Sequence, residues 1–488
     1  MKCIGGCMKA FQLSGWNIKK ILRCSLSVAI LMSFSSVSAY ATVAEPDTSL
    51  AGAGWVRIEY VSPTFGDGQP NNQNNNVYSA KVNPDNSFSV LGTTSVRTQQ
   101  CSSPDWCWTV EQVVASIANI RENGTLNNVV TTDAQFIVHG AFTPYGNKVL
   151  LLANTVPGVT GTIKRYNLDG TIDTGFADQG VFRDPNSLLS TFYPGLWQDS
   201  EGRILVASFP NGLARLLPSG VLDSTFGSDG ATGSVGGNIS SVVEAKDGAY
   251  YVMISGNTSP GARLHRYTEA GMLDTEFGTE GELALPTNTS AAQMLAMPDG
   301  GVLLLTGSLQ TNQSYNARLT HFNSQGDIVA QTEPLSEPSV RYSNFLGLER
   351  GASLTRMPDG KILLSINRQG AVPVTWSIAS MRLFGLFNPD LTPDIGFDGD
   401  NGLYLAEEEG KTIWAFDNTL PLKVTQTVDP KRRIVLVGAS INETGHNKWT
   451  VARLMGDFNG MTPPPPPPNQ STRQRGTGMP AWLFLKQD

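Results

Sequence analysis

The chain of 488 residues is poor in charge, since Asp, Glu, Lys and Arg make up only 16% of it where about 25% is usual. It also lacks any apolar run approaching the roughly 20 residues of a membrane-spanning helix. The formal net charge is −7. These shortages predict no transmembrane span and disfavour nucleic acid as a partner. Glycine is abundant instead, with 50 residues, as is typical of extracellular all-β proteins.

Histidine and recognisable catalytic motifs are scarce. The four histidines are scattered singly along the chain, so they form none of the paired spacings of a zinc site. No GxSxG, SxxK, Walker or GxGxxG context appears. The sequence therefore contains no recognisable residues for nucleophilic catalysis or nucleotide binding. The sequence therefore favours a protein that is not an enzyme and holds no cofactor. A propeller could still bring acids from separate repeats together at one mouth of its channel.

Cysteine is scarce as well. Of five cysteines, three lie within the first 24 residues, which leaves Cys101 and Cys107. We expect these two to form a disulfide, because a chain destined for export meets an oxidising environment. Closing such a short loop contributes roughly 2–3 kcal/mol in the chain-entropy model, so the bond would fix one hairpin rather than the whole fold.

The N-terminal segment has the pattern of an export signal. Lys19, Lys20 and Arg23 precede an apolar stretch over 26–34, and small residues end at Ala41. This pattern predicts a signal peptide over 1–41 and a secreted, periplasmic or cell-surface destination. Its removal takes away five of the 35 positive residues and none of the 42 acidic ones, which leaves 30 against 42 and a formal charge of about −12.

A phrase made of a turn, an aspartate and an aromatic residue recurs along the chain. Its phenylalanines are Phe176, Phe226, Phe277 and Phe397, at intervals of 50, 51 and 120 residues. The last interval spans two units, with a degraded copy near Gln325 between them. A period of this length belongs to propellers and solenoids. The phenylalanines are predicted to fill the core between neighbouring units.

Each unit also has an earlier half, in which a turn precedes a run of β-branched residues and leucine. An Asp-Gly turn between apolar runs predicts a type I′ hairpin, which needs positive φ at both central residues. An arginine-bearing strand and the aspartate phrase follow. The seven early turns begin at Asn83, Pro144, Asp199, Lys246, Pro298, Pro358 and Asp429, and the arginines are Arg165, Arg215, Arg266, Arg318, Arg382 and Arg453.

A unit of four short strands without a helical period is one blade of a propeller. We predict an all-β fold: a single β-propeller over 42–460 with seven four-stranded blades. The alternating segment from Trp55 to Val61 stands ahead of the first unit and is predicted to close the ring as an added strand. A solenoid is the competing geometry, but it would need atypical capping repeats at both ends.

The repeat resembles the delta-60 repeat family of secreted bacterial propeller-like proteins, over roughly 54–458. The family phrase is L-x-x-D-G-x-L-D-x-x-F-G-x-x-G, and the best copies are Leu216–Gly230 and Tyr267–Gly281, with Met357–Leu364 for the earlier half. The unit near Gln325 departs from it, because it lacks the Phe-Gly segment. The resemblance implies an exported repeat scaffold, and it provides no catalytic residues.

The repeated aspartates have two interpretations. Asp173, Asp223, Asp274 and Asp394 lie in turns, where a carboxylate can accept backbone N–H groups as an Asx-type cap. Calcium is the alternative, since acids in glycine-rich loops supply the oxygens that it prefers. The densest acidic stretch contains Asp398 and Asp400, followed by three glutamates over 407–409. These two aspartates are the calcium candidates.

Trp106 and Trp108 flank Cys107 and, unlike the repeat aromatics, occur once. Displayed on a rigid loop, they would form a contact surface for an extracellular protein or glycan. The alternative is that both pack beneath the loop as a local core.

The segment 461–488 contains six prolines, Pro463–Pro468, and ends in a short apolar stretch from Ala481 to Leu485. It is predicted to be a disordered, Pro-rich tail, with a truncated sorting signal as the alternative. The chain as a whole is interpreted as a binding or scaffold module at the cell surface or outside the cell. The alternative function is an extracellular hydrolase or lyase that acts on polymer with an acidic, calcium-assisted site at the channel mouth.

Overall fold

The computed structural model describes nineteen stretches of the chain. They are 47–52, 55–58, 77–103, 106–135, 137–143, 147–154, 161–183, 195–208, 212–255, 262–286, 289–309, 315–335, 352–369, 380–394, 403–406, 425–429, 431, 433–441 and 447–455. All regular elements within these stretches are strands, which confirms the predicted all-β class. No helix among them has the length and apolar character needed to cross a bilayer.

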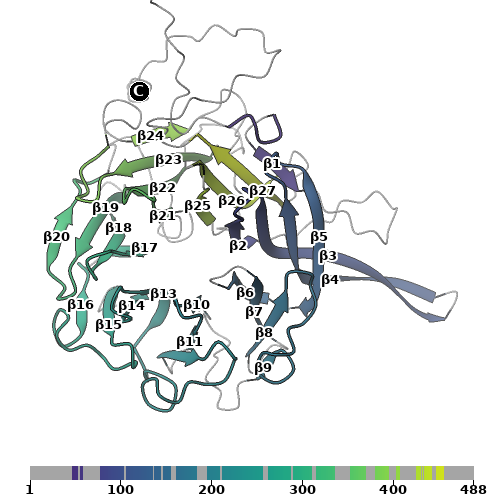
Figure 1. Ribbon diagram of the computed structural model, residues 1–488, viewed down its shortest axis with the longest axis horizontal. Coiled ribbons are helices and arrows are strands. Elements are labelled where there is room, and N and C mark those ends of the chain that lie inside the picture. Colours follow the sequence, from purple (N-terminus) through teal and green to yellow (C-terminus); the bar gives the residue numbers. More distant parts are fainter. Residues whose placement is uncertain are drawn as a thin grey trace, which may run out of the picture.

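The strands form seven antiparallel sheets arranged about a common centre (Figure 1). The first sheet contains β2 (Val77–Val82), β3 (Phe88–Ser103), β4 (Trp106–Ile120) and β5 (Leu126–Gln135). The second contains β6 (Ile137–Phe142), β7 (Lys148–Asn154), β8 (Gly161–Asn167) and β9 (Val181–Arg183). The third contains β10 (Leu196–Gln198), β11 (Ile204–Ser208) and β12 (Gly212–Leu216), with an isolated bridge between Ala214 and Ala231 at its outer edge.

The remaining sheets follow in chain order. The fourth contains β13 (Asn238–Glu244), β14 (Tyr250–Ser255), β15 (Arg263–Tyr267) and β16 (Glu282–Ala284). The fifth contains β17 (Thr289–Ala296), β18 (Val302–Leu309), β19 (Tyr315–Phe322) and β20 (Ile328–Gln331). The sixth contains β21 (Ala352–Arg356), β22 (Ile362–Gln369), β23 (Ser380–Phe387) and β24 (Leu403–Ala406).

The seventh sheet joins the two ends of the repeat region. It contains β25 (Thr425–Val428), β26 (Ile434–Ile441) and β27 (Asn447–Leu454), and its outer strand is β1 (Trp55–Ile58). Strand β1 pairs with β27 in antiparallel register, from Trp55 opposite Ala452 to Ile58 opposite Trp449. The segment predicted as a closing strand is therefore paired with the last repeat along its described part.

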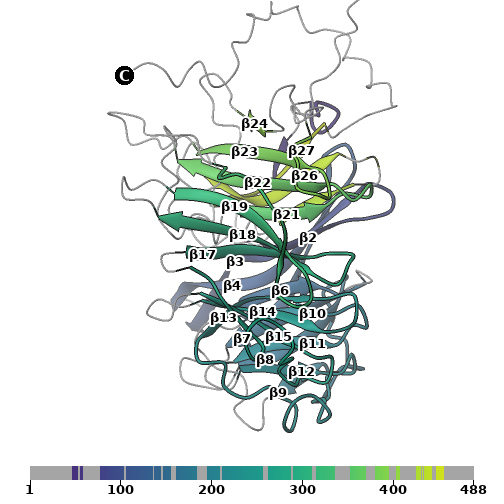
Figure 2. The same cartoon turned by 90° about the vertical axis from the view of Figure 1, so that its left-hand side faces the viewer.

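One end strand of each sheet lies toward the centre of the molecule (Figure 1), namely β2, β6, β10, β13, β17, β21 and β25. Neighbouring inner strands touch one another, including β2 with β6, β6 with β10, β17 with β21 and β2 with β25. Figure 2 shows that the strands run along the axis about which the sheets are arranged. The architecture is that of a β-propeller, as the repeat period predicted.

Where the structure describes the early turn of a unit in full, the turn lies at the predicted residues, but its geometry differs. In the fourth sheet Gly248 N–H donates to the carbonyl of Ala245, and Ala245 N–H donates to that of Ala249. Gly248 has φ of +81°, and it is alone in this turn in having a positive φ. One left-handed residue is the pattern of a type I turn followed by a G1 bulge. The prediction of type I′ turns was therefore wrong.

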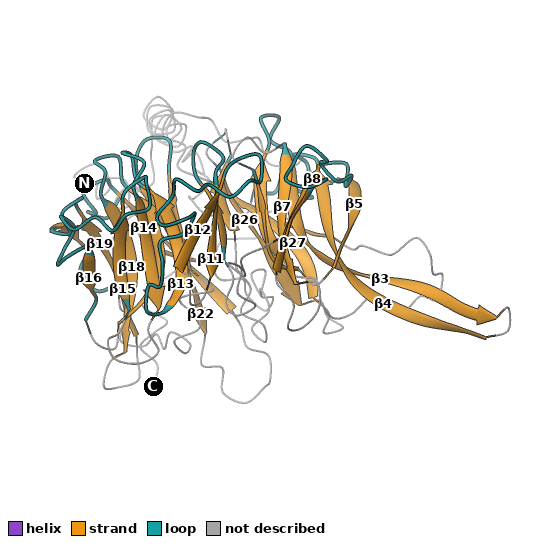
Figure 3. Cartoon of the chain, turned by 90° about the horizontal axis from the view of Figure 1, so that it is seen from below, coloured by secondary structure: helices purple, strands orange, loops and turns teal. Residues whose placement is uncertain are grey.

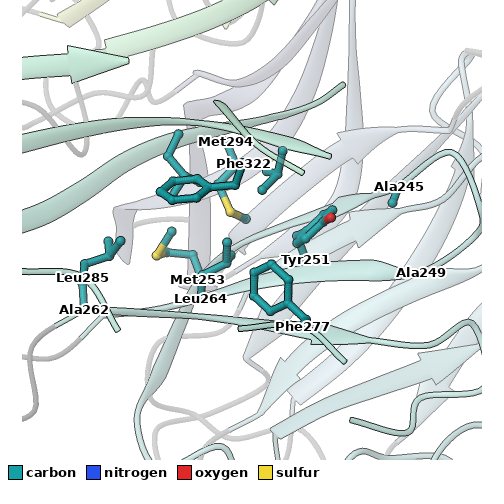
Figure 4. Packing of buried hydrophobic residues seen from close by; sticks show 12 residues of the cluster. Ala245, Ala249, Tyr251, Met253, Ala262, Leu264, Phe277, Leu285, Met294 and Phe322 are labelled. Carbon is teal, nitrogen blue, oxygen red and sulfur yellow. The ribbon is translucent and has the colours of Figure 1, made fainter. Parts of the chain in front are cut away.

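The core lies between the sheets. Figure 4 shows one interface, where Tyr251 and Met253 of the fourth sheet pack with Met294 and Phe322 of the fifth. Phe277 joins them from the aspartate phrase and is fully buried, as are Phe176 and Phe226 at their own interfaces. The predicted role of these phenylalanines is confirmed. Phe397 lies outside the described residues.

Candidate functional site

In three repeats the arginine and the aspartate form an ion pair that the sequence analysis missed. Nε of Arg165 lies 2.7 Å from Oδ2 of Asp173, and Nη2 of Arg215 lies 2.7 Å from Oδ2 of Asp223. Arg266 pairs with Asp274 in the same way. In all three pairs the partners are eight residues apart in the chain. That constant interval was the signal in the sequence that could have revealed the pairing.

The same aspartates cap their turns, as one of the two interpretations predicted. Asp223 Oδ1 accepts hydrogen bonds from the backbone N–H of Thr225 (3.1 Å) and from its hydroxyl (2.6 Å). Burial alone would raise the pKa of the Asp223 carboxyl, but the hydrogen bonds from Thr225 and Arg215 hold it below its usual value. The carboxylate is therefore ionised and fully engaged by the protein.

Two of these arginines, Arg165 and Arg215, also connect their sheet to the next one. Nη1 of Arg215 donates to the carbonyl of Glu269 in the fourth sheet (2.5 Å), and the guanidinium lies 4.4 Å from the ring centroid of Phe226. The backbone N–H of Gly227 donates to the carbonyl of Ala270 (2.7 Å). Arg165 makes the corresponding contact from the second sheet to the carbonyl of Pro218 in the third (2.5 Å).

Phenylalanine and glycine complete this contact between sheets. A Cβ atom on Gly271 would lie 2.7 Å from the ring of Phe226, and one on Gly220 would lie 2.5 Å from that of Phe176. Both glycines also have left-handed φ angles. We call the set of arginine, aspartate, phenylalanine and the glycine of the following sheet the junction clamp. Its charged and aromatic members are used in holding the sheets together.

The N-terminal segment builds a junction clamp on the last sheet. Asp47 Oδ2 accepts hydrogen bonds from Nε of Arg453 (2.7 Å) and Nη1 of Arg433 (3.1 Å). The N–H and hydroxyl of Ser49 cap the other oxygen of Asp47. Arg453 Nη1 donates to the carbonyl of Glu122 in the first sheet (2.8 Å).

Leu50 takes the place of phenylalanine in this clamp. It is fully buried, and a Cβ on Gly124 would lie 3.0 Å from its Cδ1. The residues Asp47 to Gly54 have the sequence D-T-S-L-A-G-A-G, which is the phrase D-x-x-F-G-x-x-G with leucine for phenylalanine and Ala51 for the first glycine. Requiring an aromatic residue hid this copy from the sequence analysis.

The degraded fifth unit has a different junction. There β20 begins at Ile328 directly after the turn, so the aspartate and the phenylalanine of the phrase are missing. In the sixth sheet Leu391 stands where other units have glycine, with φ of +65° and 3% of its surface exposed. It packs with Leu305, Leu319 and Ile362 between the fifth and sixth sheets. A leucine from one side thus compensates for the phenylalanine that is missing from the other.

The two histidines on arginine-bearing strands, His265 and His321, are buried. Nε2 of His265 lies 3.0 Å from Oε2 of Glu282, and burial lowers the pKa of His265. Nε2 of His321 lies 3.1 Å from Oδ2 of Asp299. In the described part of the chain no group of three or more His, Cys, Asp or Glu side chains is placed to hold a metal ion. The calcium candidates Asp398 and Asp400 lie outside that part.

A long hairpin is the main feature without a counterpart in the other units. Strands β3 and β4 pair as far as Cys101 opposite Cys107, with Trp106 opposite Ser103 beyond them (Figure 3). Strand β2 accompanies β3 only to Gly92, and β5 accompanies β4 only to Val114. We call the projecting part, 93–113, the arm. The sequence analysis predicted a hairpin here but not its length.

The arm is described by its backbone over most of its length. The register places the two cysteines directly opposite each other, which is the arrangement a cross-strand disulfide needs. The side chains of Cys101, Cys107, Trp106 and Trp108 lie outside the described residues. The disulfide and the tryptophan contact surface therefore stay predictions.

No protein-family model and no curated protein matches the chain. Among solved structures, it is similar to the propeller of Dos1 at 12% identity, over 80% of this chain and 86% of that one, with a TM-score of 0.40. The C-terminal WD40 domain of Sif2 matches at 10% identity over 79% and 97%, with a TM-score of 0.37. Hydrazine synthase of Kuenenia stuttgartiensis matches at 10% over 53% and 73%, also with a TM-score of 0.37. Likenesses at this level say nothing of what the chain does, and the resemblance to the delta-60 repeat family stays a prediction.

Proposed function

We propose that this chain is an exported β-propeller that acts as a binding or scaffold module at the cell surface or outside the cell. The junction clamps carry this proposal. Arg215, Asp223 and Phe226 and their counterparts hold neighbouring sheets together, so the recurrent charges and aromatic rings serve the scaffold. The parts available for recognition are then those that do not recur, above all the arm.

The scaffold is proposed to be a closed ring of seven blades. The pairing of β1 with β27, the contact of β2 with β25 and the clamp of Asp47 on Arg453 support closure. Burying both faces of every sheet leaves only short edges exposed. Small-angle scattering of the mature chain is the test of shape: a compact disc is expected, and a rod-like profile would contradict a closed ring.

Export is proposed because residues 1–41 have the pattern of a signal peptide. It has two measurable consequences. The secreted chain should begin at residue 42, which N-terminal mass spectrometry determines. The mature protein should contain no free thiol, because Cys101 and Cys107 are its remaining cysteines. Modification by iodoacetamide without reductant would show that the disulfide is absent.

The contact surface is proposed to lie on the arm, with Trp106 and Trp108 as anchors for an extracellular protein or glycan. Tryptophan dominates the energetics of many interfaces, so removing an anchor costs about 2 kcal/mol or more, which is roughly a thirtyfold loss of affinity. The experiment is a glycan and protein array screened with the mature chain and with a Trp106→Ala, Trp108→Ala variant.

The matched control is a Val221→Ala, Met272→Ala variant. These two apolar side chains are also exposed, at 56% and 60%, but they lie on the loops of the third and fourth sheets. Ligands retained by the control and lost by the tryptophan variant support the proposal. Equal binding by both variants would contradict it.

A further inference from the structure

The segment 47–58 contacts the rest of the propeller as a peptide ligand would. Its covalent connection to the repeats runs through residues 59–76, and the proposed processing after residue 41 leaves its other end free. Within the described chain, β1 pairs with β27 alone and is the outer strand of the seventh sheet. The segment can therefore leave without displacing another strand. We call the seven sheets without this segment the body.

The body offers this segment a site for a carboxylate. Nε of Arg453 and Nη1 of Arg433 donate hydrogen bonds to Oδ2 of Asp47, at 2.7 Å and 3.1 Å. Both arginine side chains are buried, with 0% of Arg453 and 8% of Arg433 exposed. Hydrogen bonds between charged groups are roughly twice as strong as those between neutral groups. The aspartate is thus the residue by which the site recognises its occupant.

The same site has an apolar part and a strand edge. Leu50 is fully buried beside Gly124, among apolar side chains of the first and seventh sheets. The backbone N–H of Ala51 donates to the carbonyl of Asn123 (2.9 Å), and the four residues of β1 then pair with β27. These contacts define the occupant chemically. It has an aspartate, a leucine three residues later, and an extended segment after them.

The charges of the body stay compensated when the segment leaves, with one exception. Arg433 keeps the carboxylates of Asp429 (2.7 Å) and Glu122 (2.8 Å). Arg453 keeps the carbonyl of Glu122, but among the described residues its carboxylate partner is Asp47 alone. The emptied site therefore contains one buried guanidinium that favours the return of a carboxylate.

The seventh sheet can also persist without its outer strand. It would then contain β25, β26 and β27. The third sheet of the same ring is already three-stranded, with an isolated bridge at its outer edge. A blade with three strands is thus a stable component of this propeller.

We propose that the seventh and first sheets form a peptide-binding site, and that its ligand, the chain's own segment 47–58, is released and rebound while the body stays folded. The ligand class is an extended peptide with the pattern Asp-x-x-Leu. The inference rests on the closed ring of the proposed function and goes beyond it, because a segment that only closes a ring need not exchange. An attached ligand has an effective concentration of roughly millimolar, so the occupied form dominates in the uncut chain.

The first experiment uses the full mature chain with a protease site inserted between residues 68 and 69. After the cut, the N-terminal fragment should stay bound at about 100 µM and dissociate on dilution, with a dissociation constant on the order of 10 µM. A fluorescent peptide of residues 42–58 should replace it, which fluorescence anisotropy measures. Loss of the fragment directly after the cut, or replacement no faster than global unfolding, would overturn the proposal.

Peptide variants test what the site recognises. Asp47→Asn removes the charge that Arg453 binds, and Leu50→Ala removes the buried side chain, so each peptide should bind at least about tenfold more weakly. The matched control is Thr48→Ala, because Thr48 lies between these two residues and is exposed. This control should bind like the unchanged peptide. Equal affinities of all the peptides would show that the site does not recognise the pattern.

Hydrogen exchange tests release in the uncut chain, where folding is not at risk. The hydrogen bond from Ala51 N–H to the carbonyl of Asn123 (2.9 Å) has an equivalent at the junction between the third and fourth sheets. There Gly227 N–H donates to the carbonyl of Ala270 (2.7 Å). Release predicts that the amides of Asp47 and Ala51 exchange at least about a hundredfold faster than that of Gly227. Equal protection at the two junctions would contradict release.

The inference and the proposed function can fail separately. A rod-like scattering profile of the uncut chain would contradict the closed ring. A compact disc whose segment 47–58 does not exchange would contradict the releasable ligand and leave the ring intact.

Discussion

The junction between the third and fourth sheets and the junction between the last and first sheets are built from the same parts. Arg215 corresponds to Arg453, since each binds an aspartate and donates to a carbonyl of the following sheet. Asp223 lies eight residues after its arginine, whereas Asp47 precedes its arginine by 406 residues. The comparison shows that the same kinds of contact form when the phrase is supplied by the other end of the chain.

The second arginine of each junction matches as well. Arg203 is bound by Asp199 and reaches Glu269, and Arg433 is bound by Asp429 and reaches Glu122. The difference lies in the acceptor, because Asp47 receives both Arg433 and Arg453, whereas Asp223 receives Arg215. More charge therefore converges on the junction that has no short covalent connection.

The largest expected effect comes from removing the buried arginine at the junction between the last and first sheets. Arg453 is fully buried, so an Arg453→Met substitution leaves Asp47 without its main partner and should cost about 3–5 kcal/mol of unfolding free energy. Arg215→Met is the matched control, with a similar cost. Only Arg453→Met should release the segment 47–58 to limited proteolysis of the folded protein, which mass spectrometry of the fragments detects. Release of this segment by both variants would break the comparison.

The junction between the fifth and sixth sheets tests how the space between two sheets is filled. There Leu391 stands in place of the glycine, and the phenylalanine of the phrase is missing. Leu391→Gly relieves a left-handed leucine, worth roughly 1–2 kcal/mol, but it leaves a cavity that costs about 3–5 kcal/mol. A net loss of roughly 2 kcal/mol is expected in urea unfolding. A stabilised Leu391→Gly variant would show that the side chain fills no space.

The reverse exchange, Gly271→Leu, should fail at the other type of junction. There the new side chain would meet the ring of Phe226. A loss of about 1–3 kcal/mol is expected from overpacking, and it should shrink when Phe226→Ala is added. Losses that simply add would contradict the idea that the two positions share one space.

The sequence was sufficient to predict what recurs. Turn residues and β-branched runs predicted the strands, because hairpins are local and each copy repeats the signal. The pairing of Arg215 with Asp223 was missed because it joins two halves of a unit that were interpreted separately. The copy at Asp47 was missed because Leu50 replaces the aromatic residue. The length of the arm was missed because its sequence has no hydrophobic alternation that marks where the two strands end.

Acid should weaken the junction between the last and first sheets more than the junction between the third and fourth sheets. Burial raises the pKa of Asp47 and of Glu122, but Ser49 and Arg453 on the first, and Lys431 and Arg433 on the second, hold both pKa values below their usual range. A carboxyl whose pKa is lowered by folding stabilises the protein above its unfolded pKa, and this stabilisation is lost as the pH falls through the folded value.

The junction between the last and first sheets contains two such carboxyls, Asp47 and Glu122, whereas the other junction contains Asp223, whose pKa is also lowered. The junction with two should therefore loosen first as the pH falls below about 4. The measurement is proteolysis of the segment 47–58 by pepsin between pH 4 and pH 2, compared with cleavage inside the third and fourth sheets. An Asp47→Asn variant should start from a less stable junction and respond less to acid. Simultaneous cleavage of both regions would show that the two junctions are equally sensitive to acid.

The smallest effect on the stability of the propeller is expected from removing the predicted disulfide of the arm. This change compares the sheets, which pack against one another, with the arm, which projects from them. A Cys101→Ser, Cys107→Ser variant loses a constraint worth roughly 2–3 kcal/mol, but only on a hairpin that lies outside the sheet interfaces. The melting temperature of the propeller should therefore change by less than about 2 °C, while amides of β3 and β4 beyond Gly92 exchange faster. A large drop in melting temperature would mean that the arm and the sheets unfold together. A disulfide that constrains the hairpin alone would leave the contacts of the junction clamps unchanged.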